Sequence, residues 1–203
     1  NQMLLEGTED LDVEAFNRTL GLTGAYISVG SSKDTASISM RSLVDVDKLQ
    51  PAFNLLRDVI SRPRFDSKSI ERTKARVAVE LQYRAQSPGS RASDRFASLL
   101  YDGHPYSSRP LGDEATIRNI TRDDAVSYYE TYYVRRNMVI VIVGNISREK
   151  AAELANGLGN IIPLGTKAKK LPLVKRKTKA AIDRVQFSSI QSHVRMGGLG
   201  VER

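Results

Sequence analysis

A β-hairpin predicted over residues 25–43 restricts this chain to folds that combine helices with antiparallel strands. Apolar and polar residues alternate from Ala36 to Met40, as expected for a half-buried strand. The polar residues 31–34 have the composition of a turn, which places the two strands at residues 25–30 and 35–43. Because the strands of a hairpin pair antiparallel, the sheet must contain at least one antiparallel pair.

Helical patterns lie on both sides of the hairpin. An apolar stripe through Phe16 predicts a helix that begins at an aspartate cap, Asp10 or Asp12, and ends near residues 21–24. Further helices are predicted from Asp45 or Asp47 to Pro63, over 67–86, from Ser90 to Tyr101, from Thr121 to Tyr132, and from Ser147 to about Gly157 or Gly159. Residues 138–144 and 185–196 are predicted strands. The expected class is α+β, with a mixed or antiparallel sheet and helices packed on one face.

The basic charge of the chain is concentrated in one segment. Seven of the residues between Thr166 and Ala180 are basic and none is acidic, so this run accounts for most of the formal net charge of +8. It contains no aromatic residue, whereas nucleic-acid surfaces combine basic residues with aromatic side chains. We therefore expect a solvated linker here and no nucleic-acid partner.

Two further features of the composition exclude classes of function. The chain has no cysteine, which excludes disulfides, thiolate zinc ligands and a cysteine nucleophile. No apolar run approaches the roughly 20 residues that a membrane-spanning helix needs, so no membrane span is expected.

Six different short motifs occur in order along the chain. They are M-L-L-E-G-T at residues 3–8, R-P-R-F at 62–65, H-P-Y at 104–106, Y-Y at 132–133, N-M-V-I-V-I-V-G at 137–144 and Q-S-H-V at 191–194. In these motifs the chain resembles the pitrilysin/insulinase family of zinc metallopeptidases, in which M-L-x-x-G-T follows the zinc motif H-x-x-E-H. The resemblance runs from residue 1 to about 160.

The resemblance implies a domain organisation. It implies a metallopeptidase half-domain of the pitrilysin/mitochondrial-processing-peptidase type over residues 1–160, with its N-terminal part missing. A basic linker over 161–182 and the start of a second half-domain over 183–203 would follow.

The resemblance also assigns the zinc site to unsuitable residues. In the family, the two histidines of H-x-x-E-H bind zinc, the glutamate between them activates the bound water, and a glutamate on a distant helix is the third ligand. Here Asn1 falls at the position of the motif glutamate, Gln2 at the second histidine, and Glu80 at the distant ligand. An amide cannot act as general base and is a weak zinc ligand. We therefore expect no catalytic residue and no zinc bound by this chain alone.

Glu80 and the two histidines also have plausible structural roles. Arg76 and Arg84 lie four residues on either side of Glu80, a spacing typical of surface ion pairs. His104 precedes Pro105 in a turn, where a structural hydrogen-bonding role is expected, and His193 lies in a predicted strand. Neither histidine is expected to bind metal.

From the resemblance we expect the non-catalytic subunit or half of a peptidase. Its partner, a catalytic subunit of the same family or a second copy of this chain, would supply the zinc, and the pair would bind and cleave extended peptides. The peptide would add to a strand edge formed by Ala25, Tyr26, Ile27, Ser28 and Val29. Two alternatives remain. One is an active zinc metalloendopeptidase whose motif lies upstream of residue 1, and the other is a structural core-type subunit without proteolytic role.

Overall fold

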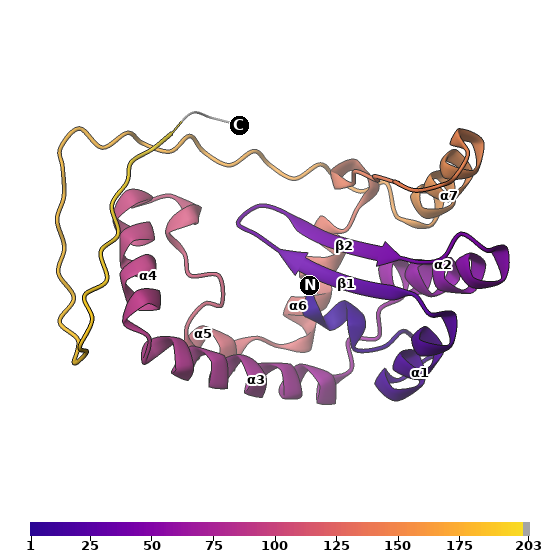
Figure 1. Ribbon diagram of the computed structural model, residues 1–203, viewed down its shortest axis with the longest axis horizontal. Helices are drawn as coiled ribbons and strands as arrows, with labels where there is room; N and C mark the ends of the chain where they lie inside the picture. Colours follow the sequence, from indigo (N-terminus) through magenta and orange to yellow (C-terminus); the bar gives the residue numbers. More distant parts are fainter. Residues whose placement is uncertain (201–203) are drawn as a thin grey trace. The chain divides into compact units, whose positions relative to one another are not determined.

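The structure is a computed structural model that describes residues 1–200. Within these residues it is a mostly helical α+β protein with one two-stranded antiparallel sheet (Figure 1). The helices are α1 (Val13–Thr23), α2 (Val46–Ser61), α3 (Ser67–Ala85), α4 (Pro88–Leu100), α5 (Glu114–Asn119), α6 (Arg122–Tyr132) and α7 (Arg148–Ile161). Short 3-10 helices are η1 (Gln2–Leu5), η2 (Pro105–Ser107) and η3 (Arg135–Asn137).

The chain divides into two compact units. Unit 1 consists of Asn1–Thr73 and Ile120–Ala168, and unit 2 consists of Lys74–Asn119 and the described residues from Lys169 onward. Helix α3 begins in unit 1 and ends in unit 2. Within residues 1–200, none of the helices combines the length and hydropathy of a membrane span.

The predicted hairpin is confirmed within a residue or two at each end. Strand β1 (Tyr26–Ser31) pairs antiparallel with β2 (Ala36–Arg41), in a register that joins Tyr26 to Arg41 and Ser31 to Ala36. The Ser32 amide donates to the Thr35 carbonyl at 2.8 Å and closes the turn. The expected sheet is thus antiparallel, but only these two strands are present in the described part of the chain.

Local capping chemistry explains why several predicted helices are confirmed. The Asp12 side chain accepts from the Ala15 amide at 2.8 Å, and α1 ends where Gly24 adopts a left-handed conformation with φ of 66°. Thr121 and Asp124 form a reciprocal capping box at the start of α6. Each of these bonds joins residues three positions apart, so the sequence alone reveals it.

Two predicted helix boundaries are wrong. Helix α4 begins at Pro88, with the Ser87 side chain as its cap, rather than after a break with Ser90 as cap. Proline at the first helical position loses no hydrogen bond, because the first amides of a helix have no intrahelical acceptor. Helix α7 continues through Gly157 to Ile161. Gly157 lies against the Phe53 ring, and this packing offsets the low helix propensity of glycine.

The predicted strand over residues 138–144 is extended but forms no ladder in the described part of the chain. Its burial alternates as in a strand: Ile140 and Ile142 pack against the core, while Val139, Val141 and Val143 are 86%, 78% and 93% exposed. The predicted strand over 185–196 is also absent from the structure. A sequence pattern reports which side chains are buried, but a strand also needs a hydrogen-bonded neighbour.

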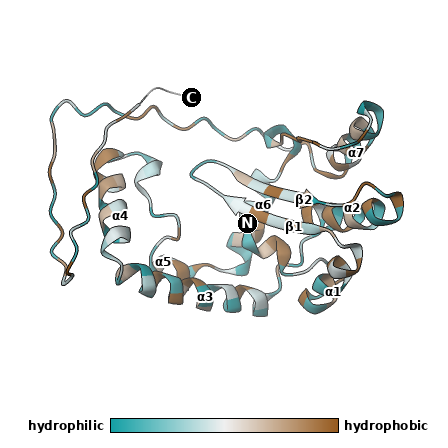
Figure 2. Ribbon diagram, viewed as in Figure 1, coloured by the Kyte–Doolittle hydropathy of each residue, from teal (hydrophilic) through white to brown (hydrophobic). Residues whose placement is uncertain are grey.

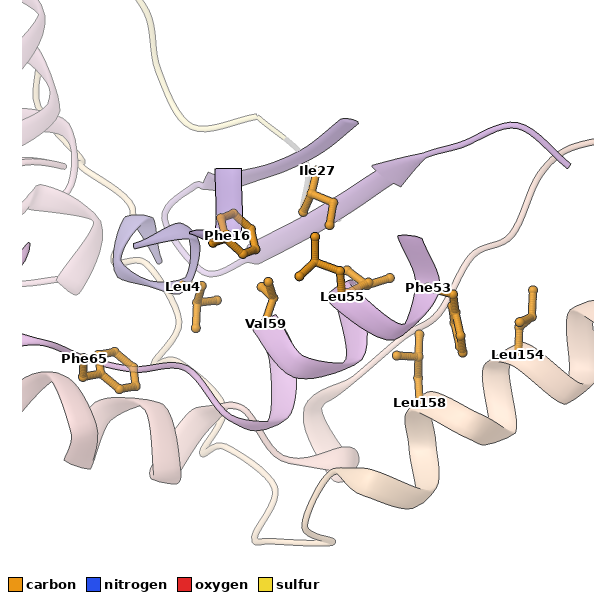
Figure 3. Close-up of a cluster of buried hydrophobic side chains, with 10 residues drawn as sticks. Leu4, Phe16, Ile27, Phe53, Leu55, Val59, Phe65, Leu154 and Leu158 are labelled. Carbon is orange, nitrogen blue, oxygen red and sulfur yellow. The ribbon is translucent and has the colours of Figure 1, made fainter. Parts of the chain in front are cut away.

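The hydrophobic core lies in unit 1. Helix α2 carries hydrophobic residues on one side and hydrophilic residues on the other (Figure 2), and its apolar side includes Phe53, Leu55 and Val59. These side chains pack with Leu4, Phe16 and Ile27 and with Leu154 and Leu158 of α7 (Figure 3). The core therefore joins η1, β1 and α7 through α2.

Candidate functional site

The first two motifs lie side by side in unit 1. Thr8 forms an isolated antiparallel bridge with Pro63, supported by the Glu9 amide on the Arg62 carbonyl at 2.9 Å. The Arg64 amide donates to the Gly7 carbonyl at 3.2 Å. Gly7 has φ of +114°, and a Cβ atom there would lie 2.6 Å from the Leu11 carbonyl oxygen. Glycine is therefore required in the first motif by the backbone itself.

The second motif connects to α6. Phe65 is buried, and its ring centroid lies 5.4 Å from that of Tyr129. The Tyr129 hydroxyl donates to the Ile60 carbonyl at 2.6 Å, and the Arg122 guanidinium donates to the Phe65 carbonyl at 3.0 Å. Helix α6 thus contacts both the end of α2 and the R-P-R-F turn that follows it.

The Asn1 carboxamide lies in a specific set of hydrogen bonds. The Tyr133 hydroxyl donates to Asn1 Oδ1 at 2.8 Å, and Asn1 Nδ2 donates to the Ser37 carbonyl at 3.2 Å and to the Gly30 carbonyl. Burial, followed by the neighbouring Tyr128 and Tyr129, raises the pKa of Tyr133 to about 12, so its hydroxyl remains a donor at neutral pH. A carboxylate at position 1 could not donate to the two carbonyls. The arrangement is therefore matched to an amide.

The three residues that the resemblance assigns to the zinc site lack the ligand chemistry of a zinc site. Asn1 uses both ends of its amide in the bonds above, and Gln2 is exposed on η1. Glu80 is exposed on the part of α3 that belongs to unit 2, and the neighbouring Arg84 pairs with Asp94 at 3.1 Å. Residues 1–200 contain no group of three or more His, Cys, Asp or Glu placed to hold a metal ion. Two amides and one carboxylate do not fit a zinc ion.

The hairpin defines the direction of each amide in β1. Hydrogen-bonded and non-hydrogen-bonded pairs alternate along an antiparallel ladder, and the bond from Ser32 to Thr35 sets the phase. The amides of Tyr26, Ser28 and Gly30 therefore point to β2. Those of Ile27 and Val29 point to the opposite edge, which has no strand neighbour within residues 1–200.

The side chains of the predicted edge strand have two environments. Ile27 is buried and Val29 packs against the core, whereas Tyr26 is 62% exposed. Ala25 lies just before the strand, and Ser28 is half-buried. The edge that carries the Ile27 and Val29 amides is thus anchored by the side chains of the same two residues.

His104 has the structural role expected from its place before a proline. It is buried in unit 2, its Nδ1 accepts from the Tyr106 amide at 3.1 Å, and its Nε2 lies 2.8 Å from the Pro172 carbonyl oxygen. Because Nδ1 accepts, Nε2 carries the proton and donates to Pro172. His193 is exposed.

Sequence reasoning missed the role of Tyr133. The Y-Y motif was visible, but the hydroxyl meets a residue 132 positions away. No local pattern encodes such a contact, and only the order of the motifs indicates that the two segments are related.

Comparison with known proteins identifies relatives of both parts of the chain. The family model "Insulinase (Peptidase family M16)" matches residues 1–114, and the model "Peptidase M16 inactive domain" matches residues 119–202. A probable mitochondrial-processing peptidase subunit beta of Arabidopsis thaliana is 22% identical over 151 residues, covering 74% of this chain and 28% of that protein. An uncharacterized zinc protease of Bacillus subtilis is 30% identical over 94 residues, covering 46% of this chain and 22% of that protein.

Solved structures of M16 proteins have a fold similar to that of this chain. The peptidase M16 inactive domain from Pseudomonas fluorescens has a TM-score of 0.84 at 34% identity, covering 87% of this chain and 43% of that chain. A protease from Helicobacter pylori has a TM-score of 0.70 at 22% identity, covering 85% of this chain and 41% of that chain. The chain spans less than half the length of each of these relatives.

Proposed function

The chain belongs to the insulinase family of M16 peptidases, and from that premise we propose that it is a non-catalytic half that pairs with a zinc-bearing partner. The observation that supports this proposal is the Asn1 carboxamide, bound to Tyr133 and to two hairpin carbonyls, at the residue that the resemblance assigns to the general base. An amide cannot take a proton from water at neutral pH. The pair would bind and cleave extended peptides, with the zinc chemistry on the partner.

The partner is a catalytic subunit of the same family or a second copy of this chain. Support comes from the relatives named as subunit beta of a mitochondrial-processing peptidase, since such a name denotes one member of an assembly. A second copy would carry the same Asn1 and Gln2. The catalytic subunit is therefore the partner we favour.

The peptide would bind at the edge of β1 that carries the amides of Ile27 and Val29. Main-chain hydrogen bonds supply affinity whatever the peptide side chains, which suits a peptidase with varied substrates. Two observations support this edge: it has no strand neighbour in residues 1–200, and its residues are anchored in the core of unit 1.

Reconstitution tests the proposed function. The chain is assayed with a fluorogenic peptide alone, and then mixed with an M16 chain of the same genome that carries an intact H-x-x-E-H motif. We expect no chelator-sensitive cleavage by the chain alone and a rate in the mixture well above that of the partner alone. Chelator-sensitive cleavage by the chain alone would support the active-enzyme alternative. An assembled complex with no gain in rate would support the structural subunit.

Three substitutions in β1 test the edge. Val29→Pro removes an amide of the unpaired edge, Val29→Ala keeps the amide but loses the packing, and Ser28→Pro removes an amide that points to β2. In the assembled complex, we expect Val29→Pro to lower kcat/KM roughly fivefold, since one backbone hydrogen bond contributes about 1 kcal/mol. Val29→Ala should lower it far less, and Ser28→Pro should chiefly destabilise the hairpin. Equal activity of Val29→Pro and Val29→Ala would rule out docking at this edge.

A further inference from the structure

Unit 2 contains a cavity whose lining includes four arginine side chains. It has a volume of about 490 Å³ and lies among the C-terminal part of α3, helix α4, residues 107–112 and Val185. Four arginines line it, Arg84, Arg91, Arg95 and Arg109, whereas Asp94 is the one acid in its wall. We refer to it as the arginine cavity.

Two of the four arginines form salt bridges within the unit and two do not. Arg84 pairs with Asp94 at 3.1 Å, and Arg95 pairs with Asp183. Arg91 and Arg109 form no salt bridge among residues 1–200, although Arg109 lies close enough to Asp113 to contribute to the lowered pKa of that carboxyl. Arg91 lies over the Phe187 ring at 5.3 Å from its centroid, a contact that orients the guanidinium without cancelling its charge. The arginine cavity therefore has an excess of positive charge, which a concave wall concentrates.

Part of the remaining wall of the cavity is apolar, beside the hydroxyl-bearing residues Ser98 and Ser107. Leu81, Ala85, Leu111 and Val185 contribute to it. Its volume lies within the range of about 300–1,000 Å³ that is typical of sites for drug-sized ligands and far exceeds that of an inorganic anion. A ligand that fits both parts has an anionic group with two acceptor oxygens beside an apolar group.

We propose that the arginine cavity binds a peptide carboxylate next to an apolar side chain. Guanidinium groups bind carboxylates through paired, charge-assisted hydrogen bonds, and Arg91 and Arg109 are the two that form no salt bridge with an acid of the described residues. The carboxylate belongs either to an acidic side chain or to the C-terminus of a peptide. The lining residues of the arginine cavity include none of β1 and none of Asn1, Gln2 and Glu80.

The experiment measures binding of three small peptides to the full chain by isothermal titration calorimetry. Acetyl-Glu-Leu-amide presents an acidic side chain, acetyl-Ala-Leu with a free carboxylate presents a C-terminus, and acetyl-Gln-Leu-amide presents neither. We expect at least one acidic peptide to bind roughly tenfold more tightly than the neutral one, as expected for a charge-assisted bond. The tighter of the two identifies the source of the carboxylate.

A matched pair of variants assigns the binding to this cavity. The double variant Arg91→Gln/Arg109→Gln should lower the affinity for the acidic peptide to that for the neutral one, with no change in Tm. The control Arg118→Gln/Arg148→Gln has the same net charge and should bind as the unmodified chain does. Equal binding of acidic and neutral peptides, or an equal loss in the control, would overturn the proposal. So would inorganic phosphate that binds as tightly as the acidic peptide.

Discussion

Units 1 and 2 are stabilised by different interactions. Every buried apolar side chain of the described residues lies in unit 1, among them Phe16 at 1% and Val59 at 0% exposed. In unit 2 the buried side chain is that of His104, and the unit is held by ion pairs such as Arg84 with Asp94 and Lys177 with Asp102. Burial of one large apolar side chain contributes about 1.5–3 kcal/mol, whereas an exposed ion pair contributes about 0–1 kcal/mol.

This difference indicates that unit 1 is the stable part of the molecule and that unit 2 opens first. The stable part contains strand β1 and the two motifs M-L-L-E-G-T and R-P-R-F. The arginine cavity and the segment 169–180 belong to the part that depends on polar contacts.

A pair of phenylalanine substitutions gives the largest expected effect on this comparison. Phe16→Ala in unit 1 should lower the free energy of unfolding by about 3–5 kcal/mol, because it leaves a cavity in a close-packed core. Phe96→Ala in the half-buried face of α4 should cost less than about 1.5 kcal/mol. Urea unfolding followed by circular dichroism measures both. Equal costs would mean that unit 2 has a core of its own.

Two hydrogen bonds of unit 2 are formed by the buried His104 side chain. His104→Ala removes the bonds to the Tyr106 amide and to the Pro172 carbonyl, at a cost of about 1–3 kcal/mol. Limited trypsin digestion of the native chain should cut first within residues 169–180, the part of the basic segment that belongs to unit 2, and several-fold faster in His104→Ala. His193→Ala, which changes an exposed histidine, is the control. First cleavage in unit 1 would contradict the assignment of the weaker region.

Substitutions in the extended segment 138–144 compare its core-facing side with its exposed side. Ile142→Ala should destabilise the protein by about 1–2 kcal/mol, part of the cost for a fully buried isoleucine. Val141→Ala on the exposed side should change the free energy of unfolding by less than about 0.5 kcal/mol. Thermal unfolding of the two variants compares them directly. A larger effect of Val141→Ala would show that the valine side is covered in solution.

A smaller effect is expected where unit 1 uses a polar contact. Tyr133→Phe should cost about 0.5–1.5 kcal/mol, because it removes the hydroxyl that donates to Asn1. The raised pKa of Tyr133, about 12 against 10 in the unfolded chain, favours the neutral hydroxyl in the folded state. This contribution is present below pH 10 and is lost as the pH rises to 12. Urea titrations from pH 9 to 11 should show a steeper loss in the parent than in Tyr133→Phe, and parallel curves would contradict it.

Features encoded within a few residues could be predicted from the sequence. The cap at Asp12, the capping box at Thr121 and the hairpin turn each depend on neighbours in the chain, and all three are present. The boundary at Pro88 was missed because proline both ends one helix and begins another, and only the Ser87 cap decides between them.

Features that depend on distant residues could not be predicted from the pattern. Residues 138–144 have the alternation of a strand, but the pattern does not specify a neighbouring strand. The pattern also does not specify the hydrogen bond between Tyr133 and Asn1. Nor does it specify that arginines of α3, α4 and the loop at Arg109 line one cavity. The resemblance supplied Asn1, Gln2 and Glu80 as the zinc positions, whereas the hydrogen bonds of Asn1 came only from the structure.

The zinc content of the purified chain tests the central claim most directly. The full chain is loaded with equimolar zinc, dialysed against a weak chelator and analysed for metal by mass spectrometry. Because the resemblance assigns the amides of Asn1 and Gln2 to positions where a carboxylate and an imidazole are needed, we predict that much less than one zinc per chain is retained. Retention of one equivalent would contradict the proposed non-catalytic role and would favour an active peptidase.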